Sequence, residues 1–586
     1  MANEHYSAFV EEAFLKPIRS VLIVDDDYPT FDEMLEARIE HNEGRQTDQS
    51  KAWYTAPARI KEVIDRFRAP THPLLVDVHD GKNVSVGEDV KIAAHLHQSD
   101  LLVLDYQLDK SKPRDGERAI AIVRGLMSND HFNLVVVHTT ENLDFVFQEV
   151  LVGVIGPLLM EPSQDEIEKA NTLIEAGEDT LEGFNARLRR SITADQYLHS
   201  RLYSSSYLRT MAKAQAPYSL FSEQCDAAGW SITDRRIVLR QLLAQTEREL
   251  LPKMNAGFTE KLTWSSGTIK WMKSDSVFIA FSNKTGDDDL LAELHKALDD
   301  SKPQPSGLFL TKLRAEIDEY GVIAQTQALG NTHALAHWYD RLLQADEPER
   351  RWRISESVSR HSDQLMSAIL PRVEEFASRL IAAEVQSGYS KEICKEHFKV
   401  DLGKDGDRRR AEREHNAFVC SMKPLGWHLT TGHVFIMNEE YWLCLSPACD
   451  MVPSQLSPAR RDVTGERLPF IAVRLQAVAD GRAVGDIQSN RFVFLQLEAG
   501  VKGFCFNDAS RDGSTPQWDT LYAERRGTFD KGGFNFRVLR SQLGRTRLVS
   551  KRYVATVVSQ LRYEYALNLM QRLGVSLTRI GLDFAG

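Results

Sequence analysis

Acidic residues follow two short apolar runs in the first fifth of the chain. VLIV is followed by Asp25, Asp26 and Asp27, and LLVL is followed by Asp105. In an open parallel sheet the carboxyl ends of the strands line one ligand crevice, so these carboxylates can converge although 79 positions separate Asp26 from Asp105. Clustered carboxylates repel one another unless a cation lies among them. Mg²⁺ prefers oxygen ligands and keeps some waters for an incoming phosphoryl group, so the pattern predicts a site for phosphoryl chemistry.

The elements that must position these carboxylates alternate along residues 19–162. IRSVLIV, HPLLVDV, DLLVLDY and NLVVVHT are continuous apolar runs, as expected for parallel strands that are buried on both faces. Between them lie the helical patterns ARIKEVIDRF, DVKIAAHL and GERAIAIVRGL. This repetition predicts a doubly wound α/β domain.

These motifs resemble the receiver domains of response regulators, which are flavodoxin-like. VLIVDDD resembles the first receiver strand with its acidic pair, here Asp25 and Asp26, and VLDYQLD resembles the third strand with the phosphoryl-accepting aspartate, here Asp105. Gln107 stands where the family offers a backbone carbonyl to the metal. LVVVHTTE resembles the fourth strand and makes Thr139 the hydroxyl that contacts the phosphoryl group and switches. The resemblance covers about a quarter of the chain.

The resemblance implies that Asp105 takes a phosphoryl group, with Mg²⁺ as cofactor, from a histidine kinase or a phosphotransfer protein. The resulting acyl phosphate biases a two-state surface that the later domains read. Receivers also carry a Lys before a Pro at the end of their fifth strand. The expected fifth strand here is GVIGP, which has Gly156 before Pro157, and no Lys occurs between Lys112 and Lys169. We therefore expect either a weak switch or a pseudo-receiver that serves as a docking surface.

The remaining chain divides into three parts by composition. Residues 1–18 are an N-terminal extension, and residues 163–415 are mostly helical, with one strand-like break at 274–284. Residues 416–586 hold short β-type runs with many Gly and Pro, and end in a predicted helix, RYVATVVSQLRYEYALNLMQRLG, capped by Gly574. The expected fold is thus multidomain, α/β plus α plus β, with a small β-barrel or sandwich near the C-terminus.

The C-terminal stretch is basic. From Glu524 to Gly586 there are twelve Arg or Lys against four Asp or Glu, a net charge of +8. With aromatic residues among them, such cations can bind a nucleic-acid backbone, and the candidate contacts are Arg545, Arg547, Lys551 and Arg552. They can equally dock on acidic parts of the same chain. One alternative function is therefore a nucleic-acid-binding protein that uses a pseudo-receiver for assembly.

A third hypothesis is an enzyme with an unrecognised C-terminal active site. Cys449 and Asp450 follow an apolar strand, with His433 nearby in sequence, but packing of a small β domain accounts for the cysteines without any chemistry. No phosphate-binding loop, kinase, metalloprotease or nucleophile-elbow motif is found. Whether the chain is an enzyme is left open.

Composition restricts the class of protein. The chain has 586 residues, 42% hydrophobic and 26% charged, with a formal charge of −11, which suits a soluble multidomain protein and excludes one whose whole surface tracks nucleic acid. Six scattered cysteines, no signal peptide and no apolar run of membrane-spanning length predict a cytoplasmic protein with no membrane contact. An oligomer is compatible with the sequence. A divergent receiver joined to unfamiliar domains resembles components of two-component-like bacterial antiviral systems.

Overall fold

The chain divides into two compact units, residues 1–312 and 313–586, which are described separately. The structure is a computed structural model. It describes residues 2–43, 57–69, 73–81, 99–109, 111–112, 114–128, 131–158, 161–202, 218–258, 262–284, 289–388, 391–452, 462, 464–478, 492–507, 515–541 and 548–578.

The first unit is built on a seven-stranded sheet with the order β2-β1-β3-β4-β7-β6-β5. Its strands are β1 (Ser20–Val24), β2 (Leu75–His79), β3 (Leu101–Leu104), β4 (Asn133–Thr139), β5 (Thr263–Ser266), β6 (Lys270–Lys273) and β7 (Val277–Asn283). The first five in spatial order are parallel, and β6 and β5 are added antiparallel at one edge. The four strands expected within residues 19–162 are confirmed. The strands were expected to be buried on both faces, but the residues of the edge strand β2 are half-buried or exposed.

The fifth parallel strand comes from far along the chain. The expectation that GVIGP forms it was wrong, because helix α7 (Leu143–Val154) continues through Gly153 and no strand follows before Pro157. Instead β7 pairs with β4 over seven residues, from Asn133 with Val277 to Thr139 with Asn283. The apolar run VFIAFSN supplies five consecutive buried apolar residues, as a central parallel strand requires.

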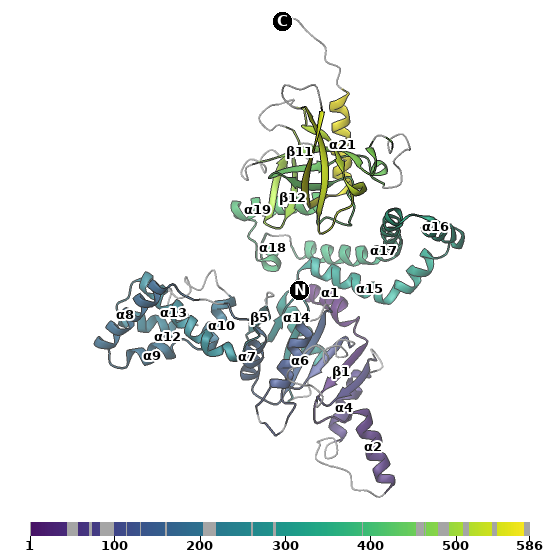
Figure 1. Ribbon diagram of the computed structural model, residues 1–586. Coiled ribbons are helices and arrows are strands. Elements are labelled where there is room, and N and C mark those ends of the chain that lie inside the picture. Colours follow the sequence, from purple (N-terminus) through teal and green to yellow (C-terminus); the bar gives the residue numbers. More distant parts are fainter. Residues whose placement is uncertain are drawn as a thin grey trace. The chain divides into compact units, whose positions relative to one another are not determined.

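Helices cover this sheet and form an inserted lobe. The described helices of the unit are α1 (Ala2–Val10), α2 (Phe31–Asn42), α4 (Pro57–Phe67), α6 (Glu117–Met127), α7, α8 (Gln164–Thr180), α9 (Phe184–Arg190), α10 (Ala194–Leu202), α12 (Ser219–Ala227), α13 (Ile232–Leu250) and α14 (Leu290–Ser301), with the short helices η1 (Glu11–Leu15) and η2 (Leu251–Lys253). Helix α15 (Pro305–Ala328) begins in this unit and continues into the second. The predicted helices ARIKEVIDRF and GERAIAIVRGL are α4 and α6, whereas DVKIAAHL lies outside the described residues. Helices α8 to α13 gather beside the sheet as a lobe inserted between α7 and β5 (Figure 1).

The second unit combines helices with a closed antiparallel barrel. Its helices are α16 (Thr332–Gln344), α17 (Glu347–Gln386), α18 (Lys391–Phe398), α19 (Asp405–Cys420) and α21 (Tyr563–Leu577), with η3 (Ala448–Met451) and η4 (Arg525–Gly527). Its strands are β8 (Ser421–Met422), β9 (His433–Met437), β10 (Glu440–Cys444), β11 (Leu468–Ala477), β12 (Phe492–Leu497), β13 (Gly500–Cys505), β14 (Trp518–Ala523), β15 (Gly533–Ser541) and β16 (Leu548–Leu561).

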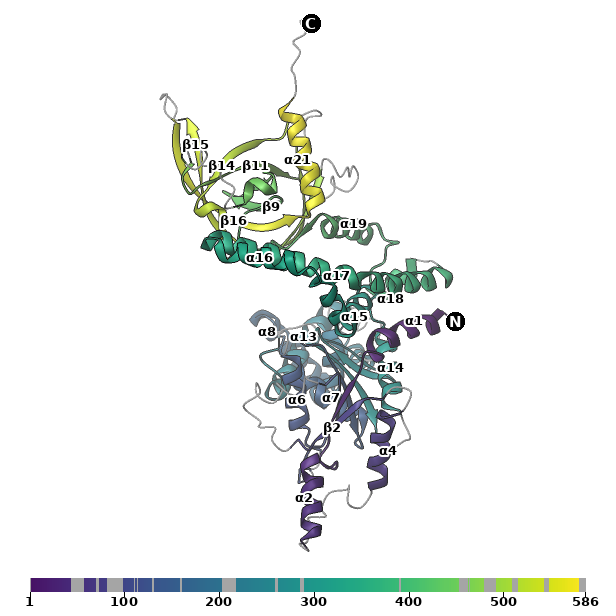
Figure 2. The ribbon, with the colours of Figure 1, turned by 90° about the vertical axis from the view of Figure 1, so that its right-hand side faces the viewer.

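Pairing of β10 with both β9 and β11 closes the ring β10-β9-β16-β15-β14-β11, so the barrel alternative is confirmed. Alternating inward side chains fill it, among them the four aromatic rings of Phe435, Phe470, Phe534 and Phe536. Helix α21 packs outside the barrel against a second apolar cluster (Figure 2).

The terminal helix is shorter than predicted. Only Tyr563–Leu577 is helical, and the preceding RYVATVVSQL belongs to strand β16. Its β-branched residues favour a strand, and its burial alternates along the chain, as it does when every second side chain faces a barrel interior. Gly574 was wrongly expected to cap the helix: it lies inside it, and its carbonyl accepts from the backbone N–H of Thr578.

Across the described ranges, no helix is both long and apolar enough to cross a membrane. The cytoplasmic location stays a prediction.

Candidate functional site

Two predicted carboxylates meet at the carboxyl end of the first sheet. The backbone N–H of Asp105 donates to Val24 O at 2.8 Å, and that of Asp25 donates to His79 O at 3.1 Å, so both residues continue the parallel hydrogen-bond ladder beyond their strands. Both are buried, and Asp25 Oδ1 also accepts from the backbone N–H of Asp27 at 2.9 Å. These main-chain contacts fix where the two carboxylates stand.

A cation that the sequence analysis did not assign to the site lies between them. Lys284 follows β7 directly, and its Nζ is 2.8 Å from Asp25 Oδ2 and 2.9 Å from Asp105 Oδ2. Only 13% of the Lys284 side chain is exposed, against 5% for Asp25 and 10% for Asp105. One ammonium group therefore bridges two mostly buried carboxylates.

The charged groups of this site, Asp25, Asp26, Asp105 and Lys284, are called the pocket below, and they shift the pKa values of Asp105 and Lys284. Burial raises the pKa of Asp105 to about 7, Lys284 opposes this rise, and the neighbouring carboxylates of Asp25 and Asp26 add to it. Burial also works against the charge on Lys284, but Asp25 and Asp105 outweigh it and raise the pKa of Lys284 above its ordinary value. The carboxylates of Asp25 and Asp26, which raise the pKa of Asp105, favour a cation among the three acidic groups.

Asp25, Asp26 and Asp105 can hold that cation. One carboxylate oxygen of each lies within 4.8 Å of the others, and nowhere else in the described residues do three His, Cys, Asp or Glu side chains form such a group. Hard oxygen ligands gathered in this way suit Mg²⁺. Gln107, whose backbone carbonyl was the fourth predicted ligand, lies half-buried in the loop after β3.

The predicted switch residue lies beside the lysine. Thr139 ends β4, is 1% exposed, and pairs in register with Asn283, the residue before Lys284. Its carbonyl accepts from the backbone N–H of Lys284 at 2.7 Å, and its Oγ1 accepts from the backbone N–H of Glu141 at 3.1 Å. The end of β4, which carries Thr139, is thus hydrogen-bonded directly to Lys284 at the end of β7.

The sequence contains a local signal for the strand that carries Lys284. The strand-like break predicted at 274–284, within the mostly helical region, includes β7. This apolar run is followed by Asn283 and Lys284, as expected for a fifth receiver strand that ends in a lysine. The inserted lobe separates Thr139 from Lys284 by 145 positions, so nearness in sequence gave no indication that the two belong together.

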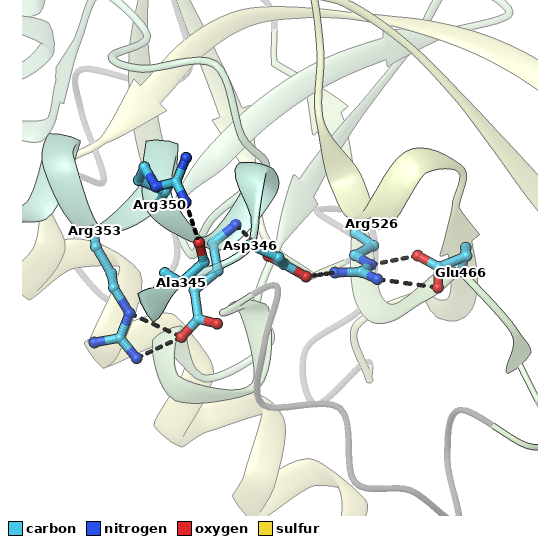
Figure 3. A network of polar contacts seen from close by, with 7 residues as sticks. Ala345, Asp346, Arg350, Arg353, Glu466 and Arg526 are labelled. Carbon is cyan, nitrogen blue, oxygen red and sulfur yellow. Dashed lines mark hydrogen bonds and ion pairs between the residues drawn. The ribbon is translucent and has the colours of Figure 1, made fainter. Parts of the chain in front are cut away.

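The C-terminal cations are partly engaged within their own unit. Arg526 lies between the barrel and the start of α17, with its guanidinium 3.0 Å from Glu466 Oε1 and 3.4 Å from Asp346 Oδ2 (Figure 3). Arg537 and Arg552 both bind Glu524, at 3.1 and 3.0 Å. These contacts are of the intramolecular kind that the sequence allowed as an alternative to nucleic acid.

Of the four predicted nucleic-acid contacts, two are described. Lys551 is exposed on β16 opposite Val538, and Arg552 makes the ion pair with Glu524. Arg545 and Arg547 lie outside the described residues. The nucleic-acid interface stays a prediction.

Cys449 and Asp450 lie together at the surface, in η3, with Cys449 Sγ 3.8 Å from Asp450 Oδ1. His433 is instead buried inside the barrel, where its Nδ1 accepts from the backbone N–H of Thr430 at 3.0 Å. The enzymatic interpretation stays a prediction.

Comparison with known proteins identifies the part of the chain that carries Asp25 and Asp105. A family model described as the response receiver domain matches residues 17–184, which hold β1 to β4 and helix α7 but end before β7. No curated protein and no solved structure matches the chain. Residues 17–184 are therefore a response receiver domain, in the N-terminal part of a chain whose remainder no family model recognises.

Proposed function

We propose that the chain is a two-component-type signalling regulator whose receiver domain accepts a phosphoryl group on Asp105 and thereby controls a binding output of the later domains. The observation that carries the proposal is the bridge from Lys284 Nζ to Asp25 and Asp105, because it places beside Asp105 the cation that GVIGP does not offer. The parallel strand order β2-β1-β3-β4-β7 supports a flavodoxin-like receiver, whose ligands bind at this edge of the sheet.

In the proposed reaction, a carboxylate oxygen of Asp105 attacks the phosphorus of a phosphohistidine on a kinase or phosphotransfer protein. The new O–P bond forms as the N–P bond breaks, and the electron pair of that bond stays on the imidazole nitrogen of the donor, which then takes up a proton from water. The buried, partly desolvated position of Asp105 excludes competing water from one side of the carboxylate.

The neighbouring residues have distinct roles. Lys284 neutralises charge on the phosphoryl oxygens by a charge-assisted hydrogen bond, once its contact with Asp105 is exchanged for one with the new acyl phosphate. Thr139 offers its hydroxyl from the adjoining strand end. Asp25, Asp26, Asp105 and the carbonyl of Gln107 would hold Mg²⁺, which supplies charge neutralisation between attacking and transferring oxygens.

The experiment is phosphoryl incorporation from acetyl phosphate in the presence of Mg²⁺, measured on the intact chain. We expect one phosphoryl group per chain in the wild type and none in Asp105→Asn. The matched control is Asp109→Asn, the same substitution in the same loop, at a carboxylate that pairs with Arg118 at 3.5 Å and lies outside the acidic cluster. Equal incorporation into Asp105→Asn and the wild type would refute the assignment.

A further inference from the structure

The segment before β1 packs against the elements that follow β7. Helix α1 continues into the π-helix η1, and together they bury Val10 and Ala13 almost completely, with Phe9 and Phe14 nearly as deep. Burial of four apolar side chains stabilises this packing by several kcal/mol in order of magnitude, at about 1.5 kcal/mol or more for a large side chain. The segment is therefore part of the first unit.

On α14 the segment contacts the last two turns. Ser7 Oγ lies 3.1 Å from His295 Nε2 and donates to Asp299 Oδ2, and the carbonyl of Ser7 lies 3.1 Å from the same ring nitrogen. His295 Nε2 is also 3.6 Å from Asp299 Oδ2. Side chain and backbone of one residue of α1 are thus both tied to α14.

Two further contacts reach past the end of α14. Tyr6 Oη donates to the carbonyl of Pro303 at 2.6 Å, in the three-residue connection between α14 and α15. Glu12 pairs with Lys312 at 3.3 Å, and their side chains are only 17% and 16% exposed. A mostly buried ion pair is costly to break, because both charges have already lost most of their contact with water. The segment consequently contacts α14, the connection and α15 in turn.

Helix α14 is in turn held by the strands next to the pocket. It begins six residues after Lys284 and packs on β7, with Leu290, Leu294 and Leu298 buried, and Asp300 accepts from Trp271 Nε1 of β6 at 2.8 Å. Its connection to α15 is short and contains Pro303, whose φ is fixed. Helix α14 is thus tied to β7 near its start and to β6 and the α15 connection near its end. A shift of β7 at Lys284 is therefore expected to move α14 as well.

We propose that α1 and η1 form an N-terminal brace that fixes α15 on α14, so that both helices move as one body with β7. Helix α15 continues beyond Lys312, where the first unit ends, so the brace makes it a stiff output element of the pocket. The signalling part of this inference rests on the proposed function, whereas the brace itself does not.

The brace is tested by charge exchange in the intact chain without any phosphodonor. The variants are Glu12→Lys, Lys312→Glu and the double variant, and the measurement is amide hydrogen exchange of residues 302–312. We expect each single variant to exchange about tenfold faster there and the double variant to return to the wild-type rate. The control is Lys296→Glu, which reverses a charge of α14 that pairs with Glu293 at 2.7 Å outside the brace, and it should leave these rates unchanged. Wild-type rates in both single variants, or no recovery in the double variant, would overturn the brace.

Coupling is tested by adding Mg²⁺ and beryllofluoride to the same proteins. In the wild type we expect altered exchange both at the pocket, residues 101–109, and in α15. In each single variant the pocket response should remain and the α15 response should be lost, and an undiminished α15 response would overturn the coupling. If the wild-type pocket itself does not respond, the proposed function fails, and the brace is judged by the exchange without phosphodonor alone.

Discussion

At the scale of single residues, the pocket depends on Lys284. Without it, Asp25 and Asp105 would face each other as two mostly buried carboxylates whose negative charges repel. The expectation of a weak switch or a pseudo-receiver rested on a fifth strand at GVIGP, which does not form. How strongly the domain switches stays a prediction. Burial disfavours the charged form of Asp105, and the ammonium group of Lys284 offsets part of the cost of burying the two carboxylates.

Burial also controls a histidine in the barrel. His433 is fully buried, and burial lowers its pKa to about 4, although hydrogen bonds with the Leu425 backbone and the Gln560 side chain act in the opposite direction. In the unfolded chain the pKa is about 6.5, so the unfolded state binds more protons between these values. The stability contributed by a neutral His433 is therefore complete above pH 6.5 and is lost as the pH falls toward 4.

We expect His433 to cost the second unit about 2 kcal/mol of stability between pH 7 and pH 5, at 1.36 kcal/mol per pKa unit. The measurement is the urea unfolding free energy at both pH values for the wild type and His433→Asn. Asparagine keeps an acceptor for the Thr430 N–H and cannot take up a proton, so its acid loss should be smaller by this amount. An equal loss in both proteins would show that His433 does not titrate on unfolding.

At the scale of elements, the connection from β3 to α6 depends on a glycine. Tyr106, the residue after Asp105, is 1% exposed and lies against Gly116, where an added Cβ would come within 2.0 Å of the Tyr106 ring. Helix α6 begins directly after Gly116 and has no side-chain cap. The absence of a side chain here lets the loop that carries Gln107 close over the tyrosine ring.

Gly116→Ala should therefore lower the free energy of opening of β3 and β4 by about 1 to 3 kcal/mol, the usual cost of overpacking. Native-state hydrogen exchange of the β3 and β4 amides measures it. Gly307→Ala is the matched control, because no atom lies within 4 Å of its added Cβ and α15 favours alanine. If Gly116→Ala and Gly307→Ala had the same free energy of opening, the Tyr106 ring would move aside without loss of stability, contrary to this prediction.

The sequence predicted those elements whose signal is local. Asp25 and Asp105 could be placed because each follows its own apolar strand, and parallel strands bring their ends together. The strand before Lys284 has a local signal, but its pairing with β4 across the inserted lobe depends on long-range contacts that no local pattern encodes. Lys284 therefore could not be placed at the site. The prediction of a helix at RYVATVV was wrong for a related reason. Its apolar residues fit helical spacing as well as strand alternation, and the pairing of β16 within the barrel selects the strand.

At the scale of the whole molecule, the receiver sheet is completed only by β7. Strand β4 is almost entirely buried between β3 and β7, so a chain that ends before β7 would expose it as a long apolar edge. The fragment 19–162, the extent predicted for the receiver domain, is thus expected to aggregate or remain unfolded. The fragment 1–312 should fold.

Size-exclusion chromatography and thermal unfolding followed by circular dichroism distinguish the two fragments. We expect a monomer with a cooperative transition for 1–312 and neither property for 19–162. A monomeric, cooperatively unfolding 19–162 fragment would show that β7 is dispensable for the receiver sheet.

The central claim is that Asp105 and Lys284 act as one phosphoryl pocket across the inserted lobe. The most direct measurement compares the wild type with Lys284→Met and Lys284→Arg after treatment with acetyl phosphate and Mg²⁺, following both incorporation at Asp105 and hydrogen exchange in β4 and β7. We predict that Lys284→Met loses the phosphorylation-dependent change in exchange, even where Asp105 still takes up the phosphoryl group, and that Lys284→Arg, which keeps the charge, retains part of it. A Lys284→Met protein that responds like the wild type would contradict the account.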